Sequence, residues 1–303
     1  MKFSDSLYTL RQMTLRNIKI FLKDRAAVFF SLLAPLIVLM LYILFLGDIQ
    51  VSSVKSFFPE GTPVDDRAIR SFVDSWMIAG VLSVSCITVS LGANSVMVQD
   101  RSRGVLYDSL SSPVKRWVIT AGYFAANFLV TLVICLIVFA VCLAYLALTG
   151  GFCLTAADLL YALGVMLLSI LSATVLTVFI AGFFRTESAL SAFGGIVSAA
   201  IGFLIGAYMP MSVFPKAVQY FACIFPGSHS AGLFRTCLMR GALEELGTSL
   251  PEQAIAGLRE GFSMELNLFG AEVGAPVMWA VLAASVAVFA ALNLLFAFKS
   301  KRR

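Results

Sequence analysis

Long apolar segments alternate with shorter polar segments along this chain of 303 residues. Six apolar segments contain no Asp, Glu, Lys, Arg or His, and each approaches or exceeds the roughly 20 residues that a helix needs to cross a bilayer. They are residues 28–46, 76–98, 118–148, 159–184, 189–209 and 276–298. The pattern predicts an all-α integral membrane protein with six transmembrane helices.

The segment before the first span has a different periodicity. Between residues 5 and 25, Leu7, Leu10 and Ile18 recur at roughly helical spacing, with basic residues between them. We expect an amphipathic interfacial helix on the inner membrane surface within residues 1–27, and the alternative is a basic flank without a helix of its own. The basic positions of this helix are Arg11, Arg16, Lys19 and Lys23.

The longest segment between spans, residues 210–275, begins with three prolines, Pro210, Pro215 and Pro226. Short apolar pieces lie on both sides of Pro226, and neither is long enough to cross a bilayer. They predict a re-entrant hairpin that enters the outer half of the membrane, packs against other spans and returns. The more polar residues that follow predict a small outer helical cap.

The distribution of charge predicts the orientation. If the N-terminus is inside, fifteen of the 22 basic residues fall in inner segments, in agreement with the positive-inside rule. Residues 28–209 then hold five spans, with a first outer loop at 47–75, and residues 299–303 form a basic inner tail. Only 13% of the residues are charged, against about a quarter in soluble domains, so residues 1–303 are interpreted as a single transmembrane domain. The basic residues are spread over four inner segments, which disfavours nucleic-acid binding.

Motifs for catalysis or energy supply are absent from the sequence. There is no G-x-x-x-x-G-K-[ST] loop for nucleotide phosphates, and the six apolar segments contain no ionisable residue that could relay protons. The single histidine, His229, has no neighbouring metal ligands, and the six cysteines form no C-x-x-C pair. A disulfide between Cys223 and Cys237 stays an open alternative. We therefore expect no catalytic residue, metal site or cofactor in this chain, and a partner that supplies energy.

Residues 99–117, between the second and third apolar segments, are charged and patterned. Leu106 and Leu110 are four residues apart, so they share one face of a short helix that ends before Pro113. We expect an inner helix with an exposed apolar ridge that fits a groove of a partner protein. The residues assigned to this contact are Asp100, Arg101, Arg103, Gly104, Leu106, Leu110 and Pro113.

With these features in this order, the chain resembles the membrane subunit of ATP-binding-cassette (ABC) exporters in the short six-helix class, which includes drug-resistance and polysaccharide-export permeases. That family has an inner-surface helix before the first span, a coupling helix between spans two and three, and re-entrant helices before span six. The family's coupling pattern is matched by Asp100-Arg101, Gly104-Val105-Leu106, Leu110 and Pro113, although Gln99-Asp100 replaces the usual leading Glu. Its outer proline-rich segment followed by an arginine is matched by Pro210, Pro215, Pro226 and Arg235.

The resemblance implies the partners and the activity. Two membrane subunits would pair, two ATPases holding ATP and Mg²⁺ would bind below them, and closure of the ATPases would be passed through the coupling helix to the spans. We expect a permease of the bacterial inner membrane, with cytoplasmic termini and lipid around it. It would export an amphiphilic drug-like or lipid-like compound. The alternatives are a lipid-linked polysaccharide exporter and a membrane scaffold without transport.

The fifth apolar segment contains small residues at every fourth position: Gly194, Ser198, Gly202 and Gly206. Such a stripe lets another helix approach closely, either within the chain or from a second subunit. Together with the resemblance, the stripe favours a subunit interface or a path between the subunits, and we expect a homodimer.

Overall fold

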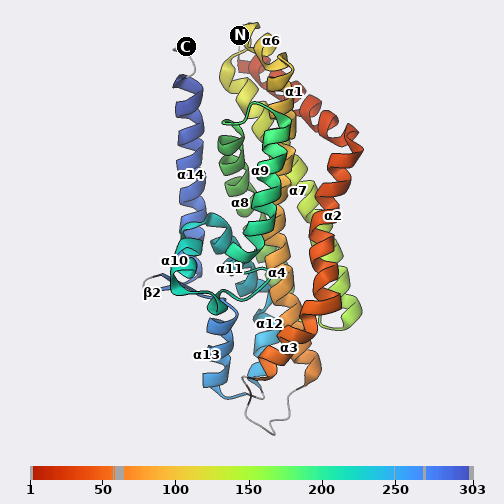
Figure 1. Cartoon of the computed structure of the whole chain (residues 1–303), viewed down its shortest axis with the longest axis vertical. Helices are drawn as coiled ribbons and strands as arrows, with labels where there is room; N and C mark the ends of the chain where they lie inside the picture. Colours follow the sequence, from red (N-terminus) through yellow and green to blue (C-terminus); the bar gives the residue numbers. More distant parts are fainter. Residues whose placement is uncertain (1–2, 57, 59–64, 249, 269–270, 300–303) are drawn as a thin grey trace.

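The computed structural model describes the whole chain except residues 1–2, 57, 59–64, 249, 269–270 and 300–303. Six of its helical segments are long and apolar enough to cross a membrane, which confirms the predicted all-α membrane fold with six spans. The first and last described residues lie at the same end of the helical bundle (Figure 1). The spans are Arg25–Lys55, Asp66–Ser102, Arg116–Thr149, Ala156–Ala181, Glu187–Leu204 and Ala275–Leu295.

The elements in chain order are α1 Phe3–Lys23, α2 Arg25–Leu41, a π-helical turn Tyr42–Leu46, α3 Gly47–Lys55, α4 Asp66–Ala93, α5 Ser95–Ser102, α6 Val105–Ser111, α7 Arg116–Thr149, α8 Ala156–Ala181, α9 Glu187–Leu204, a 3₁₀ turn Met211–Val213, α10 Lys216–Ile224, α11 Pro226–Leu238, α12 Arg240–Gly247, α13 Glu252–Gly261, β1 Leu266–Leu268, β2 Ala271–Val273 and α14 Ala275–Lys299.

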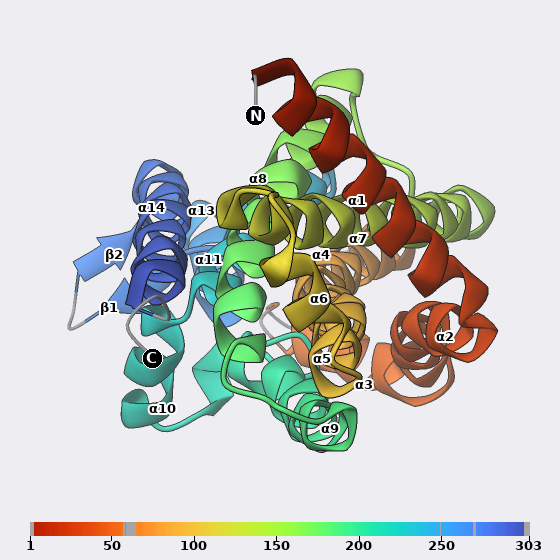
Figure 2. The ribbon, with the colours of Figure 1, turned by 90° about the horizontal axis from the view of Figure 1, so that it is seen from above.

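Helix α4 is the centre of the bundle. It packs against α2, α7, α8, α9 and α11, and almost all of its side chains are buried (Figure 2). Small residues permit this close packing: Gly80 lies so near Ala207 that a Cβ atom at position 80 would come within 2.8 Å of it. By contrast, α2 exposes large apolar side chains such as Phe29 and Phe30, as expected for a helix that faces lipid.

The first span is longer than its apolar segment. The chain continues from α2 through the π-helical turn into α3, and α4 begins at Asp66, where the Asp65 side chain accepts a hydrogen bond from the Arg67 amide at 2.9 Å. Residues 47–55 and 66–75 are therefore helical, and the prediction of a loop over the whole of residues 47–75 is wrong. The cause is the packing of α3 against α4, together with the Asp65 cap, which extends helical structure into polar sequence.

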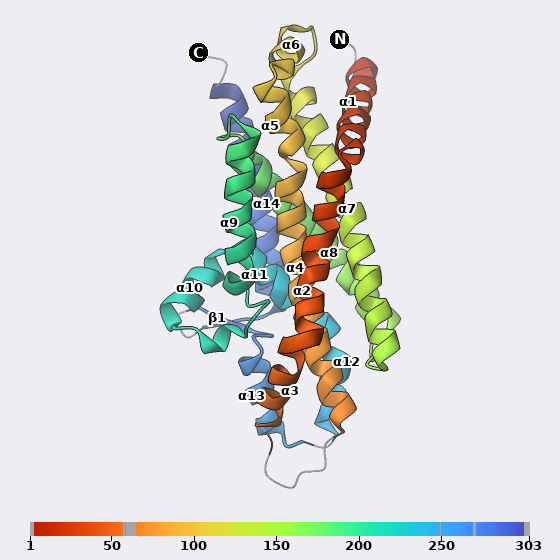
Figure 3. The same ribbon diagram turned by 45° about the vertical axis from the view of Figure 1, so that its right-hand side comes forward.

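The segment after α9 contains the predicted hairpin of short helices. Helices α10 and α11 meet at Phe225–Pro226, and both are too short to cross a bilayer (Figure 3). Helix α11 is buried against α4, α8 and α14, whereas α10 exposes Phe221 and Ile224. The cap that follows contains α12 and α13 together with a β-hairpin, in which Leu266 pairs with Val273 in antiparallel register.

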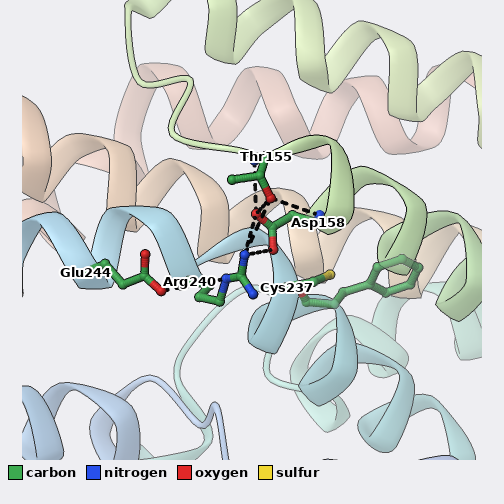
Figure 4. Close-up of polar contacts among 6 residues, drawn as sticks. Thr155, Asp158, Cys237, Arg240 and Glu244 are labelled. Carbon is green, nitrogen blue, oxygen red and sulfur yellow. Dashed lines mark hydrogen bonds and ion pairs between the residues drawn. The ribbon is translucent and has the colours of Figure 1, made fainter.

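A polar cluster attaches this cap to the spans. Thr155 and Asp158 form a capping box at the start of α8, and the buried Asp158 carboxylate forms an ion pair with Arg240 of α12 at 3.0 Å (Figure 4). Arg240 also lies 3.8 Å from Glu244, one turn further along α12. The Asp158–Arg240 ion pair therefore connects the start of the fourth span to the cap. No disulfide joins any two cysteines among the described residues, Cys223 and Cys237 included.

Candidate functional site

The predicted coupling segment forms a short corner between two helices. Helix α5 ends at Ser102, Gly104 turns the chain, and α6 begins at Val105. The φ angle of Gly104 is +83°, in the left-handed region that residues with a Cβ atom adopt only under strain. A Cβ atom at this position would have no neighbour within 4 Å, so glycine is required here by backbone conformation rather than by lack of space.

We expect Gly104→Ala to destabilise this corner by about 1 kcal/mol, because alanine is strained at positive φ. The thermal unfolding midpoint of the purified protein and hydrogen exchange of α6 measure the effect. Gly247→Ala is the matched control, since position 247 is helical and open and should gain slightly from alanine. Equal responses of the two variants would contradict the assigned role of Gly104.

Asp100 joins three helices at this end of the bundle. Its buried carboxylate accepts two hydrogen bonds from the Arg16 guanidinium of α1, at 2.6 and 2.9 Å. The Tyr123 hydroxyl of α7 donates a third hydrogen bond, also at 2.6 Å. The hydrogen bonds to Asp100 raise the pKa of Arg16 above its ordinary value, so the guanidinium stays charged at any physiological pH. Bidentate geometry fixes α1 against α5 in one orientation.

Arg101 connects the same corner to the fourth span. Its guanidinium donates hydrogen bonds to the carbonyl oxygens of Ala181, Gly182 and Phe184, at 3.2, 2.9 and 2.7 Å. These carbonyls lie at the C-terminal end of α8, where a cation is favoured by the helix dipole. The neighbouring Gln99 donates a hydrogen bond to Glu187 at the start of α9, at 3.3 Å.

The other residues predicted for the partner contact are placed differently. Arg103 and Pro113 are exposed, and Leu106 is half-buried against the apolar core. The side chain of Leu110 lies outside the described residues. Of the four basic positions predicted on α1, Arg11, Lys19 and Lys23 are exposed, and Arg16 alone turns inward to Asp100.

Comparison with known protein families identifies the family of this chain. The family model described as ABC-2 type transporter matches residues 8–239, from α1 to the end of α11. This chain belongs to that family. It is therefore the multi-pass membrane component of an ABC transporter, and its partner is an ABC ATPase subunit. None of the curated proteins compared with it matches.

The small-residue stripe of this ABC-2 subunit is not continuous. Helix α9 ends at Leu204, and Gly206 lies beyond it with a φ angle of +69°, so the fifth span does not extend to residue 209. A Cβ atom at Gly202 would meet the ring of Tyr208 within the same chain, at 2.2 Å. Gly194 is nearest to Leu91 of α4. Ser198 lines a small cavity with Pro35 and Tyr208 of the same chain, and Gly194 and Ser198 are half-buried.

Arg235 explains why the fifth span ends where it does. Its side chain is completely buried, and it donates hydrogen bonds to the carbonyl oxygens of Ile205, Gly206 and Ser263, at 3.1, 2.6 and 3.1 Å. The guanidinium also lies 5.8 Å from the ring centre of Trp76 in α4. Arg235 therefore holds the end of α9, the short helix α11 and the cap together. The three prolines predicted with Arg235 all lie at the starts of helical segments. Pro210 precedes the 3₁₀ turn, Pro215 precedes α10, and Pro226 is the first residue of α11.

Sequence reasoning missed the buried acidic residues. Asp74 lies inside α4 and Asp158 in the first turn of α8, and both are almost completely buried. Asp74 stands two positions before the charge-free segment 76–98, so a search for charge-free segments excluded it. The available signal was the acidic pair Asp65-Asp66, a helix N-terminus pattern that would have started the second span about ten residues earlier.

Proposed function

We propose that this ABC-2 subunit exports an amphiphilic drug-like or lipid-like compound from the cytoplasm or the inner leaflet, driven by ATP that the partner ATPase hydrolyses. ATP and Mg²⁺ would be bound by the ATPase. The corner around Asp100 and Arg101 is the observation that carries the proposal. It links α6, the helix we assign to the ATPase contact, to the ends of several spans.

The connections at this corner provide a route for mechanical work. A displacement of α6 acts on α5 across Gly104, on α1 and α7 through Asp100, and on α8 through Arg101. The links through Asp100 and Arg101 are hydrogen bonds to charged groups, the stronger class of hydrogen bond, and Asp100 is shielded from solvent. One push at the surface would therefore reach four helices together, as a rigid-body rearrangement requires.

The end of the bundle that carries α6 is proposed to face the cytoplasm. The described ends of the chain and α6 lie at this same end (Figure 1). Most basic residues of the sequence belong to the segments at this end, which favours an inward position by the positive-inside rule. A bacterial inner membrane is the compartment we propose for the protein.

The interior favours an amphiphile over a glycan. The hydroxyl of Ser90 donates to the Asn127 side chain at 2.9 Å and lies 2.7 Å from the Thr177 hydroxyl, while Ser172 and Ser285 pair at 2.6 Å. Because these polar groups satisfy one another between helices, they are not available for the many hydroxyls of a sugar chain. An apolar cargo with one polar end fits such an interior better.

The ATPase contact is tested with Leu106→Asp combined with Leu110→Asp. Two carboxylates on the proposed contact face should abolish co-purification of the ATPase, because charged groups cannot be buried without partners. The matched control, Leu106→Met with Leu110→Met, keeps the apolar character and should retain the ATPase. A wild-type amount of bound ATPase with the double Asp variant, in protein that elutes as a single species, would refute the proposed contact.

A second copy of this chain is proposed to pair through the outward face of α9. Gly195, Ala199 and Ala200 are exposed there, and small side chains permit close helix contact. Copies carrying Gly195→Cys should therefore form an intermolecular disulfide in the membrane. Leu190→Cys is the control, because Leu190 of the same helix is buried within the chain and should not crosslink. Crosslinking at neither position would count against this interface.

A further inference from the structure

Asp74 is an acidic residue inside a span without a partner of opposite charge. It lies two turns into α4, and it is only 3% exposed. Its Oδ2 atom has no hydrogen-bond partner among the residues that the structure describes. A buried carboxylate in a membrane span is costly unless a cation or hydrogen-bond donors compensate it, and such residues mark functional sites.

The basic residues nearest to Asp74 are engaged elsewhere. Arg70 acts on Asp74 electrostatically, but its guanidinium pairs with Asp48 of α3 at 2.8 Å. Lys55 forms an ion pair with Asp66 at 2.7 Å, and the Arg67 Nε atom donates to the carbonyl of Gly150. The sequence of residues 57–64 contains no Lys, Arg or His. Within the described part of the chain, no salt bridge neutralises the Asp74 carboxylate.

Two tyrosines from neighbouring helices face the same carboxylate. Tyr42 is buried, its hydroxyl has no partner among the described residues, and it interacts electrostatically with Asp74. It begins the π-helical turn Tyr42–Leu46, a kind of irregularity that is frequent at functional sites. Tyr145 of α7 also lies beside Asp74. Three helices thus bring two phenol rings to one carboxylate.

A cavity reaches Asp74 from the end of the bundle opposite the termini. Its volume is about 470 Å³, within the range of small-molecule sites, and its lining includes residues of α3, α4 and the turn between α7 and α8. Asp48 and Asp66 line the cavity with exposed carboxylates, and Lys55, Arg67 and Arg70 line it with basic groups. Asp74 is the buried acid among its lining residues. The cavity therefore combines an open, charged entrance with one enclosed negative charge.

We propose that this cavity binds the cationic group of an amphiphile, such as a protonated amine, with the Asp74 carboxylate as its counterion. Tyr42 and Tyr145 do not line the cavity, and both act on the Asp74 carboxylate, Tyr145 through a side-chain hydrogen bond. This inference rests on the proposed export of an amphiphile, and it narrows the cargo to cations. Asp74 supplies the charge that selects them.

Binding of a fluorescent amine to the full-length protein in nanodiscs tests this assignment. The probes are monodansylcadaverine, a primary amine, and its N-acetyl derivative, which differs in lacking the charge. The wild type should bind the amine at least about tenfold more tightly than the amide, and Asp74→Asn should remove this preference. Asp66→Asn, which alters an exposed acid of the same cavity, is the matched control and should keep it. A preference that survives in Asp74→Asn, or is absent from the wild type, overturns the proposal.

A chemical measurement on the wild type covers the case in which Asp74→Asn does not fold. Dicyclohexylcarbodiimide reacts with carboxyl groups in apolar surroundings, and mass spectrometry of the digested protein identifies the labelled residue. Monodansylcadaverine should slow the labelling of Asp74, and the N-acetyl derivative should not. Equal labelling with both probes overturns the proposal, and so does a lack of labelling, because a cavity open to the amine also admits this reagent.

Neither measurement contains the ATPase or requires transport. Failure of cation binding would leave the exporter proposal intact, with a different cargo. Loss of the ATPase contact in the Leu106 and Leu110 variants would leave the binding result unaffected.

Discussion

Arg235→Ala will lower the free energy of unfolding by about 3–5 kcal/mol, more than any other single truncation proposed for this protein. The side chain is completely buried, so its removal leaves a void as well as three carbonyl groups of Ile205, Gly206 and Ser263 without their donor. The loss should concentrate where these carbonyls lie, at the end of α9 and in the cap. Denaturation by SDS in mixed micelles measures the energy, and hydrogen exchange measures its location.

The control for this prediction is Arg259→Ala. Arg259 lies in the same cap, in α13, and it is exposed, so its truncation should change stability by less than about 0.5 kcal/mol. Arg235→Lys should recover only part of the loss, because one ammonium group cannot reproduce the planar fork that reaches three carbonyls. If Arg235→Ala and Arg259→Ala were equally stable, Arg235 would not hold α9 to the cap.

Arg16→Met will destabilise the protein by about 2 kcal/mol and loosen α1 from the bundle. This loss is smaller than for a fully buried pair, because the Arg16 side chain is 39% exposed whereas that of Asp100 is 6% exposed. The variant leaves a buried carboxylate that is hydrogen-bonded to Tyr123 alone among its described partners. SDS denaturation and hydrogen exchange of α1 measure the two effects.

A double-mutant cycle isolates the ion pair. Combining Arg16→Met with Asp100→Asn removes both charges, so the double variant should be more stable than the sum of the single losses predicts, by at least about 1 kcal/mol. Arg11→Met is the control on the same helix, because Arg11 is exposed and its loss should have little effect. Additive losses in the cycle would show that α1 is held by its apolar face rather than by this pair.

The six spans and the short helix α6 could be predicted because their determinants are local. An uninterrupted apolar segment marks each span, and Gly104 followed by Leu106 marks the start of α6. The partners of Asp100 and Arg101 could not be predicted, because Arg16 and Phe184 lie 84 and 83 residues away in sequence. The local sequence around a charged residue near the end of a span is the same whether its side chain contacts a partner protein or another helix of its own chain.

The errors at the opposite end of the bundle have a common physical cause. Charge-free segments underestimate a span when tertiary packing supports polar residues, as it does for Asp74 in α4, and they overestimate it when a buried side chain ends the helix, as Arg235 does for α9. Gly206 was placed on a helical stripe although it adopts a left-handed turn. The second span was predicted too short and the fifth too long. Both errors occur at buried charged residues, Asp74 and Arg235, which a search for apolar segments does not take into account.

Helices α4 and α5 together form an almost unbroken rod of 37 residues, about 55 Å long at 1.5 Å per residue. Asp100 is near one tip and Asp74 is about 40 Å away along the axis. A stiff rod held at its middle behaves as a lever, so a tilt of about 5° moves Asp100 by about 2 Å and Asp74 by about 1 Å in the opposite direction. Force applied to α6 would thereby move Asp74, near the other end of the rod, and change the shape of the proposed cation site. No series of side-chain contacts between the two acids is needed.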